Sequence, residues 1–224
     1  MNSKAQRVAR FGLLVALSLV LGYFDRAIPV TWFLSGAVPG IKLGLANTVL
    51  LYGVYLMDPV SCLALMLSKV LLSGFLFGSM SAILYSLCGG ALSLAVMLLV
   101  RKNARIGALV IALLAAASDG MLLWRNPTPG GQMLWCVILI AAACLFAVAA
   151  FVAIGKNPAW GVMGTSLAGA VSHNIGQILA ASAVLRTPQL LFTYLPVLVG
   201  IGAAVGSLTG FVAQRVFRAL RLEV

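Results

Sequence analysis

Residues 80–100 read MSAILYSLCGGALSLAVMLLV, and this stretch has no charged side chain before Arg101 and Lys102. An α-helix needs about 20 apolar residues to cross the hydrocarbon core of a bilayer. The stretch has that length, and the basic residues that follow it are typical of the cytoplasmic end of a membrane span. It therefore predicts a transmembrane helix.

The composition of the whole chain agrees with this prediction. Of its 224 residues, 62% are hydrophobic and 8% are charged, and the mean hydropathy is +1.11. A soluble domain carries about 25% charged residues, because its surface faces water. We therefore expect a multi-pass protein of the cell membrane whose main contact is the lipid bilayer. The net charge of +11 does not indicate nucleic-acid binding, because the basic residues form no patch with interleaved aromatic residues.

Eight segments are apolar and long enough to be read as spans, which predicts an all-α, polytopic transmembrane helix bundle forming a single domain over 1–224. The segments are approximately 10–24, 43–57, 59–78, 80–100, 106–124, 132–155, 159–185 and 190–213.

Basic residues predict the orientation of this bundle, because cytoplasmic loops are enriched in Lys and Arg. With the N-terminus inside, ten of them fall in the cytoplasm: Lys4, Arg7, Arg10, Arg101, Lys102, Arg105, Lys156, Arg215, Arg218 and Arg221. Four fall outside: Arg26, Lys42, Arg125 and Arg186. We therefore expect both termini to be cytoplasmic.

The residue types required for catalysis are scarce. The chain has four acids, Asp25, Asp58, Asp119 and Glu223, and no two of them are close in sequence. It has no aspartate-rich motif of the kind that holds magnesium and pyrophosphate, no P-loop and a single histidine. We therefore expect no enzyme, no catalytic residue, no bound metal and no cofactor.

Polar residues inside the spans are the candidates for binding a substrate. Lys69 lies near the middle of span 59–78, where a charge is costly unless it faces a cavity or a partner. It is read either as a contact to an anionic ligand or as a structural hydrogen-bond donor. His173, Asn174 and Gln177 lie within one helical turn, and they are read either as ligand contacts or as an interhelical hydrogen-bond network. Three further candidates are Lys42, Asn47 and Tyr85.

Small residues repeat at helical spacing in three spans, and such stripes let helix backbones approach closely. They serve packing within the chain or docking of a partner subunit. The stripes are Ala5, Ala9, Gly12 and Ala16 in the first span; Gly164, Ala168, Ser172, Gly176 and Ala180 in the seventh; and Gly202, Gly206 and Gly210 in the last.

Two motifs, PGIKLGLAN at 39–47 and AGAVSHNIGQ at 168–177, together with 71–78 and 84–90, resemble the Gx transporter family. Its members are also known as heptaprenyl diphosphate synthase component I. That family is similar to the substrate-binding membrane subunits of energy-coupling factor (ECF) importers. The resemblance implies six core helices, an outer lid after the first helix, and docking on a coupling subunit with ATPases through the small residues of the first helix.

The resemblance covers roughly 1–102 and 156–221, so residues 103–155 are expected to be an inserted helical hairpin. The leading hypothesis is a non-catalytic importer subunit that binds a small polar or anionic metabolite, such as a vitamin or cofactor precursor. The second hypothesis is a membrane accessory component of heptaprenyl diphosphate synthase in isoprenoid-quinone synthesis. A stand-alone carrier is the third.

Overall fold

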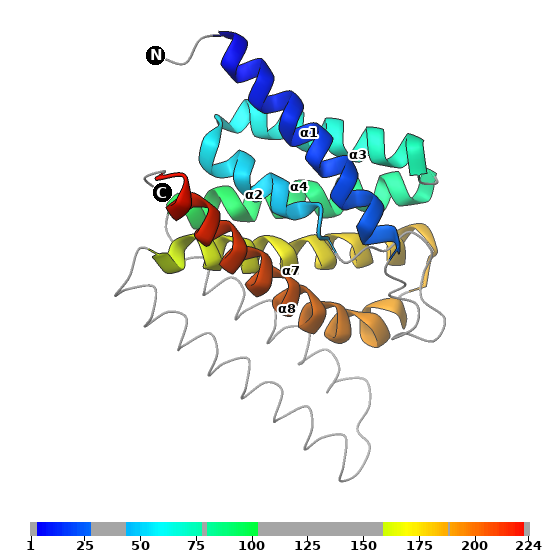
Figure 1. Ribbon diagram of the computed structural model, residues 1–224. Helices are drawn as coiled ribbons and strands as arrows, with labels where there is room; N and C mark the ends of the chain where they lie inside the picture. Colours follow the sequence, from blue (N-terminus) through cyan, green and yellow to red (C-terminus); the bar gives the residue numbers. More distant parts are fainter. Residues whose placement is uncertain (1–3, 28–43, 78–79, 103–158, 188, 222–224) are drawn as a thin grey trace.

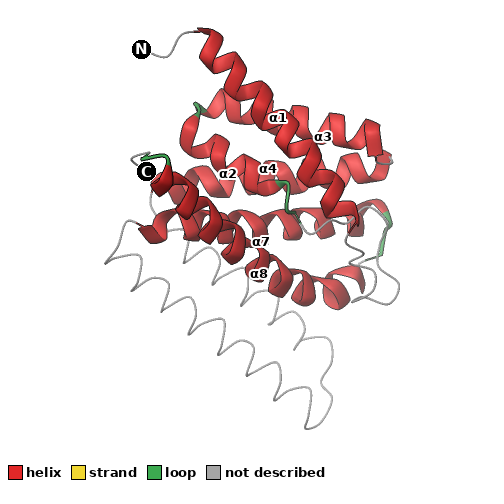
Figure 2. Ribbon diagram, viewed as in Figure 1, coloured by secondary structure: helices red, strands yellow, loops and turns green. Residues whose placement is uncertain are grey.

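The structure, a computed structural model, describes residues 4–27, 44–77, 80–102, 159–187 and 189–221. Within these ranges the regular structure is entirely helical (Figure 2). The helices are α1 (Lys4–Ala27), α2 (Asn47–Leu56), α3 (Pro59–Phe77), α4 (Met80–Lys102), α7 (Ala159–Val184) and α8 (Gln189–Ala219). Four of them contain stretches long and apolar enough to cross a membrane: Lys4–Asp25, Pro59–Leu76, Met80–Lys102 and Val197–Ala219. The predicted all-α class with membrane-spanning helices is thus confirmed.

The described helices alternate in direction along the chain, so their ends gather at two ends of the molecule (Figure 1). The start of α1, the connection from α2 to α3, the end of α4 and the end of α8 lie at one end. The end of α1, the start of α4 and the connection from α7 to α8 lie at the other. This arrangement puts the basic residues at the start of α1, at the end of α4 and at the end of α8 at the same end of the molecule.

Helix α7 is the interior helix of the bundle and packs along α4 and α8. Every residue from Thr165 to Ile178 is buried. A helix that is surrounded by protein does not need lipid-facing apolar residues, so it can carry Ser, His, Asn and Gln. Helix α7 lies in the predicted span 159–185, although it is not one of the four helices that are long and apolar enough by composition to cross a membrane.

The span expected over 43–57 is shorter in the structure. Helix α2 has 10 residues and therefore rises about 15 Å, roughly half of the hydrocarbon thickness. It is preceded by a turn in which Gly44 has a φ of +87°, a backbone conformation that favours glycine. The turn that contains Gly44 is not helical, so the helix begins only at Asn47.

Asp58 connects α2 to α3 and caps the first turn of α3. Its carboxylate accepts hydrogen bonds from the Ser61 backbone N–H at 3.0 Å and from Ser61 Oγ at 2.8 Å. These bonds, with the positive charge of Arg7 as a smaller contribution, hold the pKa of Asp58 below its ordinary value. Pro59 follows as the first residue of α3, where its missing N–H costs no hydrogen bond. Asp58 and Pro59 together therefore favour the start of α3 at this position.

Glycines bring the three central helices into close contact. A Cβ on Gly206 of α8 would lie 2.8 Å from the Leu167 Cα of α7, and one on Gly176 of α7 would lie 2.7 Å from the Gly89 Cα of α4. Gly202 and Gly210 likewise face α7. The predicted stripes on α7 and α8 therefore pack within the chain.

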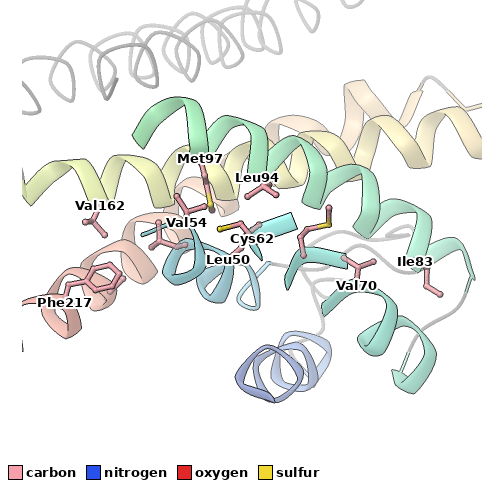
Figure 3. Close-up of a cluster of buried hydrophobic side chains, with 12 residues drawn as sticks. Leu50, Val54, Cys62, Val70, Ile83, Leu94, Met97, Val162 and Phe217 are labelled. Carbon is pink, nitrogen blue, oxygen red and sulfur yellow. The ribbon is translucent and has the colours of Figure 1, made fainter. Parts of the chain in front are cut away.

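The largest apolar cluster among the described residues joins α2, α3, α4, α7 and α8 (Figure 3). Burial of such side chains contributes about 1.5–3 kcal/mol each in water, whereas in lipid the close van der Waals packing matters more. Its labelled members are Leu50, Val54, Cys62, Val70, Ile83, Leu94, Met97, Val162 and Phe217.

Several expectations concern residues outside the described ranges. These are the spans 106–124 and 132–155, the inserted hairpin 103–155, and the candidate residue Lys42. The total of eight spans and the cytoplasmic placement of both termini therefore stay predictions.

Candidate functional site

A small polar cavity lies between five elements of the bundle. Its volume of about 20 Å³ is enough for one water molecule. Charged and polar side chains come from α1 (Asp25), α3 (Lys69 and Ser73), α4 (Ser86) and α7 (His173). The remaining wall is made by Gly22, Gly44, Ala46 and Val70. Five polar side chains thus converge on one point in the interior of a membrane-type bundle.

Lys69 is the cation of this cavity, and it is 7% exposed. Its Nζ donates a hydrogen bond to Asn47 Oδ1 at 3.3 Å. Asn47 Nδ2 in turn donates to Ser93 Oγ at 2.7 Å, and Ser93 donates to the Gly169 carbonyl at 2.8 Å. This chain of hydrogen bonds links α3, α2, α4 and α7, so the position of the ammonium group depends on all four helices.

Asp25 is the anion of the cavity, and it holds the turn before α2. It is 3% exposed, and its two carboxylate oxygens accept the Gly44 N–H at 3.0 and 3.1 Å. From the sequence, the first span was expected to end at 24 with Asp25 in the outer loop. Helix α1 instead continues to Ala27, which carries Asp25 into the interior.

His173 lies between two glycines. A Cβ on Gly44 would be 3.3 Å from His173 Cδ2, and one on Gly89 would be 3.0 Å from His173 Nδ1. The imidazole, which is 4% exposed, therefore occupies space that any larger residue at either position would take. Both glycines are needed to seat this ring at the cavity.

The other predicted site residues lie outside the cavity lining. Tyr85 is 1% exposed and packs with Ala181. Gln177 is buried beside Gly89 at the contact of α4 and α7. Asn174 donates from Nδ2 to the Leu198 carbonyl of α8 at 2.7 Å. The structure therefore groups Lys69 and His173, with Asn47 directly behind Lys69, and places Asn174, Gln177 and Tyr85 at helix contacts.

We expect Asn174→Ala to lower the stability of the fold and to leave ligand affinity unchanged. The substitution removes a buried hydrogen bond between α7 and the Leu198 carbonyl of α8, and such a bond contributes about 0.5–1.5 kcal/mol. Thermal unfolding and ligand affinity should be measured on the same purified variant. A loss of affinity without a loss of stability would place Asn174 in the binding site.

The small-residue stripe of the first span, proposed for partner-helix packing, faces outward. Ala5, Ala9, Gly12 and Ala16 are all exposed, and a Cβ on Gly12 would meet nothing within 4 Å. This face of α1 is therefore not covered by the described part of the chain.

Asp25 in the cavity and Ser93 behind it were not among the predicted site residues. Asp25 was interpreted as a loop residue because it directly follows the apolar run 11–24. The chain has only four acids, so an acid at the end of an apolar run was a usable signal. Ser93 gave no signal, because a serine within an apolar span is common and its link between Asn47 and Gly169 depends on packing.

The polar groups that line the cavity are able to bind a small polar molecule. It offers an ammonium, a carboxylate, an imidazole and two hydroxyls at close range. Among the described residues, no group of three His, Cys, Asp or Glu side chains could hold a metal ion. The arrangement can recognise a small polar group through hydrogen bonds and charge.

The chain matches the heptaprenyl diphosphate synthase component I family over residues 14–122 and 128–216. It belongs to this family. The matched ranges include residues 103–122 and 128–155 of the segment expected to be an inserted hairpin, and that expectation stays a prediction. No curated protein and no solved structure shows significant similarity to the chain.

Proposed function

We propose that this member of the heptaprenyl diphosphate synthase component I family is the non-catalytic, substrate-binding membrane subunit of a small-molecule importer. The observation that carries the proposal is the buried polar cavity around Lys69. A charge near the middle of a span costs several kcal/mol unless it serves a ligand, an ion or a partner. A cavity inside the bundle, lined by polar groups, is the usual form of a substrate site in transport proteins.

The cavity chemistry favours a small polar or anionic metabolite. Lys69 supplies an ammonium group to the cavity lining, and its Nζ also donates to the amide oxygen of Asn47. His173, Ser73 and Ser86 add hydrogen-bonding groups of either polarity at the same point. A vitamin or cofactor precursor with an acidic group would satisfy this set.

Binding of such a molecule requires the cavity to enlarge, because its present volume is that of one water. The wall that can move at least cost is the turn Gly44–Ala46, since it is not part of a helix. Two hydrogen bonds from the Gly44 N–H to Asp25 hold this turn. Entry of the ligand would break these hydrogen bonds, so Asp25 would hold the site closed when no ligand is bound.

Energy for uptake would come from separate subunits. The chain has no P-loop, so ATP hydrolysis would be supplied by ATPases through a coupling subunit. The exposed small-residue face of α1 is the surface proposed for that contact.

A second candidate function follows from the family itself. The family name describes one component of a heptaprenyl diphosphate synthase. In that reading the protein is a membrane accessory of isoprenoid-quinone synthesis, and Lys69 would face a diphosphate. Its natural partner would then be a prenyl synthase rather than an ATPase.

The test is purification of the protein from its native membrane, with identification of what it retains. Mass spectrometry of the released small molecules and of copurifying proteins should find a polar metabolite together with ATPase subunits. Recovery of a prenyl synthase, with a prenyl diphosphate in place of the metabolite, would establish the second function and refute the first.

A further inference from the structure

A second cavity lies far from the first, near the start of α1. Arg10 and Asp25 are fifteen residues apart on this helix, which corresponds to about 22 Å. The second cavity has a volume of about 410 Å³. It is lined by Arg7, Arg10, Tyr55, Leu56, Met57, Asp58, Ser61 and Arg101. These residues come from α1, the connection of α2 to α3, and the end of α4, which meet at one end of the bundle (Figure 1).

The cavity carries an excess of positive charge. Three arginines face one acid, Asp58, which gives a net charge of +2. Asp58 already accepts two hydrogen bonds from Ser61, so the arginines are not needed to satisfy it. An excess of guanidinium groups in a concave site is the arrangement that proteins use for phosphate, because the planar group can donate two parallel hydrogen bonds.

Arg101 is held in place by contacts within the bundle. Its Nη1 donates to the Val54 carbonyl near the end of α2, and its guanidinium lies 5.5 Å from the centre of the Tyr55 ring. A carbonyl and a ring fix the direction of this side chain while leaving its charge unneutralised. The cavity therefore has one cation that is positioned in advance on α4, opposite two cations on α1.

The cavity lies where the helices α1, α3 and α4 begin or end, and the ends of spanning helices meet the headgroup region of a bilayer. Beside it, α1 exposes Val8 at 72% and Leu13 at 70%, and α3 exposes Val60 at 76%. Such apolar faces on spanning helices contact acyl chains, whereas the arginines lie at the helix ends. Basic pockets between spans on the cytoplasmic side are known sites for anionic headgroups.

We propose that this cavity binds a phosphate-bearing anion, held by Arg7, Arg10 and Arg101. Two sources can supply this group: the headgroup of an anionic phospholipid and soluble inorganic phosphate. The binding does not depend on the function of the cavity at Lys69, since the two cavities share no residue.

The test compares two double variants with equal loss of charge. Arg7→Gln/Arg10→Gln removes two cations of the cavity, and Arg215→Gln/Arg218→Gln removes two exposed cations of α8 at the same end. Binding is measured by native mass spectrometry with phosphatidylglycerol against phosphatidylcholine, and by titration with inorganic phosphate in uncharged detergent. A charge-assisted hydrogen bond from each arginine contributes about a tenfold factor, so the first variant should bind about 100-fold more weakly, whereas the second should lose much less.

The outcomes separate the source of the anion from the existence of the site. A loss confined to phosphatidylglycerol in Arg7→Gln/Arg10→Gln supports a lipid site, and a loss confined to inorganic phosphate supports a soluble ligand. An equal loss in both double variants would show general surface attraction and overturn the proposal. It is overturned as well if the native protein binds neither phosphatidylglycerol in preference to phosphatidylcholine nor inorganic phosphate.

Discussion

Substitution of Lys69 by methionine should weaken retention of the bound metabolite by about 10- to 150-fold, because hydrogen bonds to a charged group contribute roughly 1.5–3 kcal/mol. Methionine keeps an unbranched side chain of similar length, so it fills most of the space of the buried lysine. What is lost is the ammonium at the cavity and its hydrogen bond to Asn47 Oδ1. The affinity is measured for the molecule that mass spectrometry identifies in the purified native protein.

Lys102→Met is the matched control for this variant. It makes the same chemical change at the exposed end of α4, outside the cavity at Lys69. It should bind the metabolite as the native protein does. If Lys69→Met folds, as judged by size-exclusion chromatography and thermal unfolding, and retains native affinity, then Lys69 is a structural donor and the binding role fails.

The class of the fold was predictable from composition, because the sparse charge leaves lipid as the only solvent for most of the surface. The positions of α3 and α4 were predictable to within a few residues for the same reason. The length of α2 was not, because apolar character extends through 43–57 and periodicity cannot show that Gly44 adopts a positive φ. Hydropathy therefore locates a hydrophobic segment but not the point where a helix begins within it.

The candidate site was predictable only in part. Lys69 is recognisable in the sequence because a charge inside an apolar span needs an explanation. His173, Asn174 and Gln177 share one turn, yet α7 is surrounded by helices, so neighbouring residues on it face different partners: the cavity for His173, α8 for Asn174 and α4 for Gln177. The sequence places these three residues on one helical turn but does not show which helix each of them contacts. It therefore could not separate His173 from Asn174 and Gln177.

The contact between α4 and α7 is expected to fail when Gly176 is replaced by alanine. The added Cβ would lie 2.7 Å from the Gly89 Cα and 2.9 Å from the Cys88 carbonyl oxygen. Both atoms belong to backbone, so no side-chain rotation can relieve the overlap and the helices must separate. Overpacking of this kind costs about 1–3 kcal/mol, and the gain in helix propensity from glycine to alanine, up to about 1 kcal/mol, offsets only part of it.

Gly200→Ala provides the control, because Gly200 is exposed on α8 and a Cβ there meets nothing within 4 Å. This variant should be as stable as the native protein or slightly more stable, whereas Gly176→Ala should unfold at a lower temperature in the same detergent. The separation of α4 from α7 also moves Ser86 away from His173, two residues that line the Lys69 cavity. Gly176→Ala should therefore bind the metabolite more weakly even below its unfolding temperature. Native stability in this variant would mean that the two backbones are not in contact, and that the cavity is shaped by side chains alone.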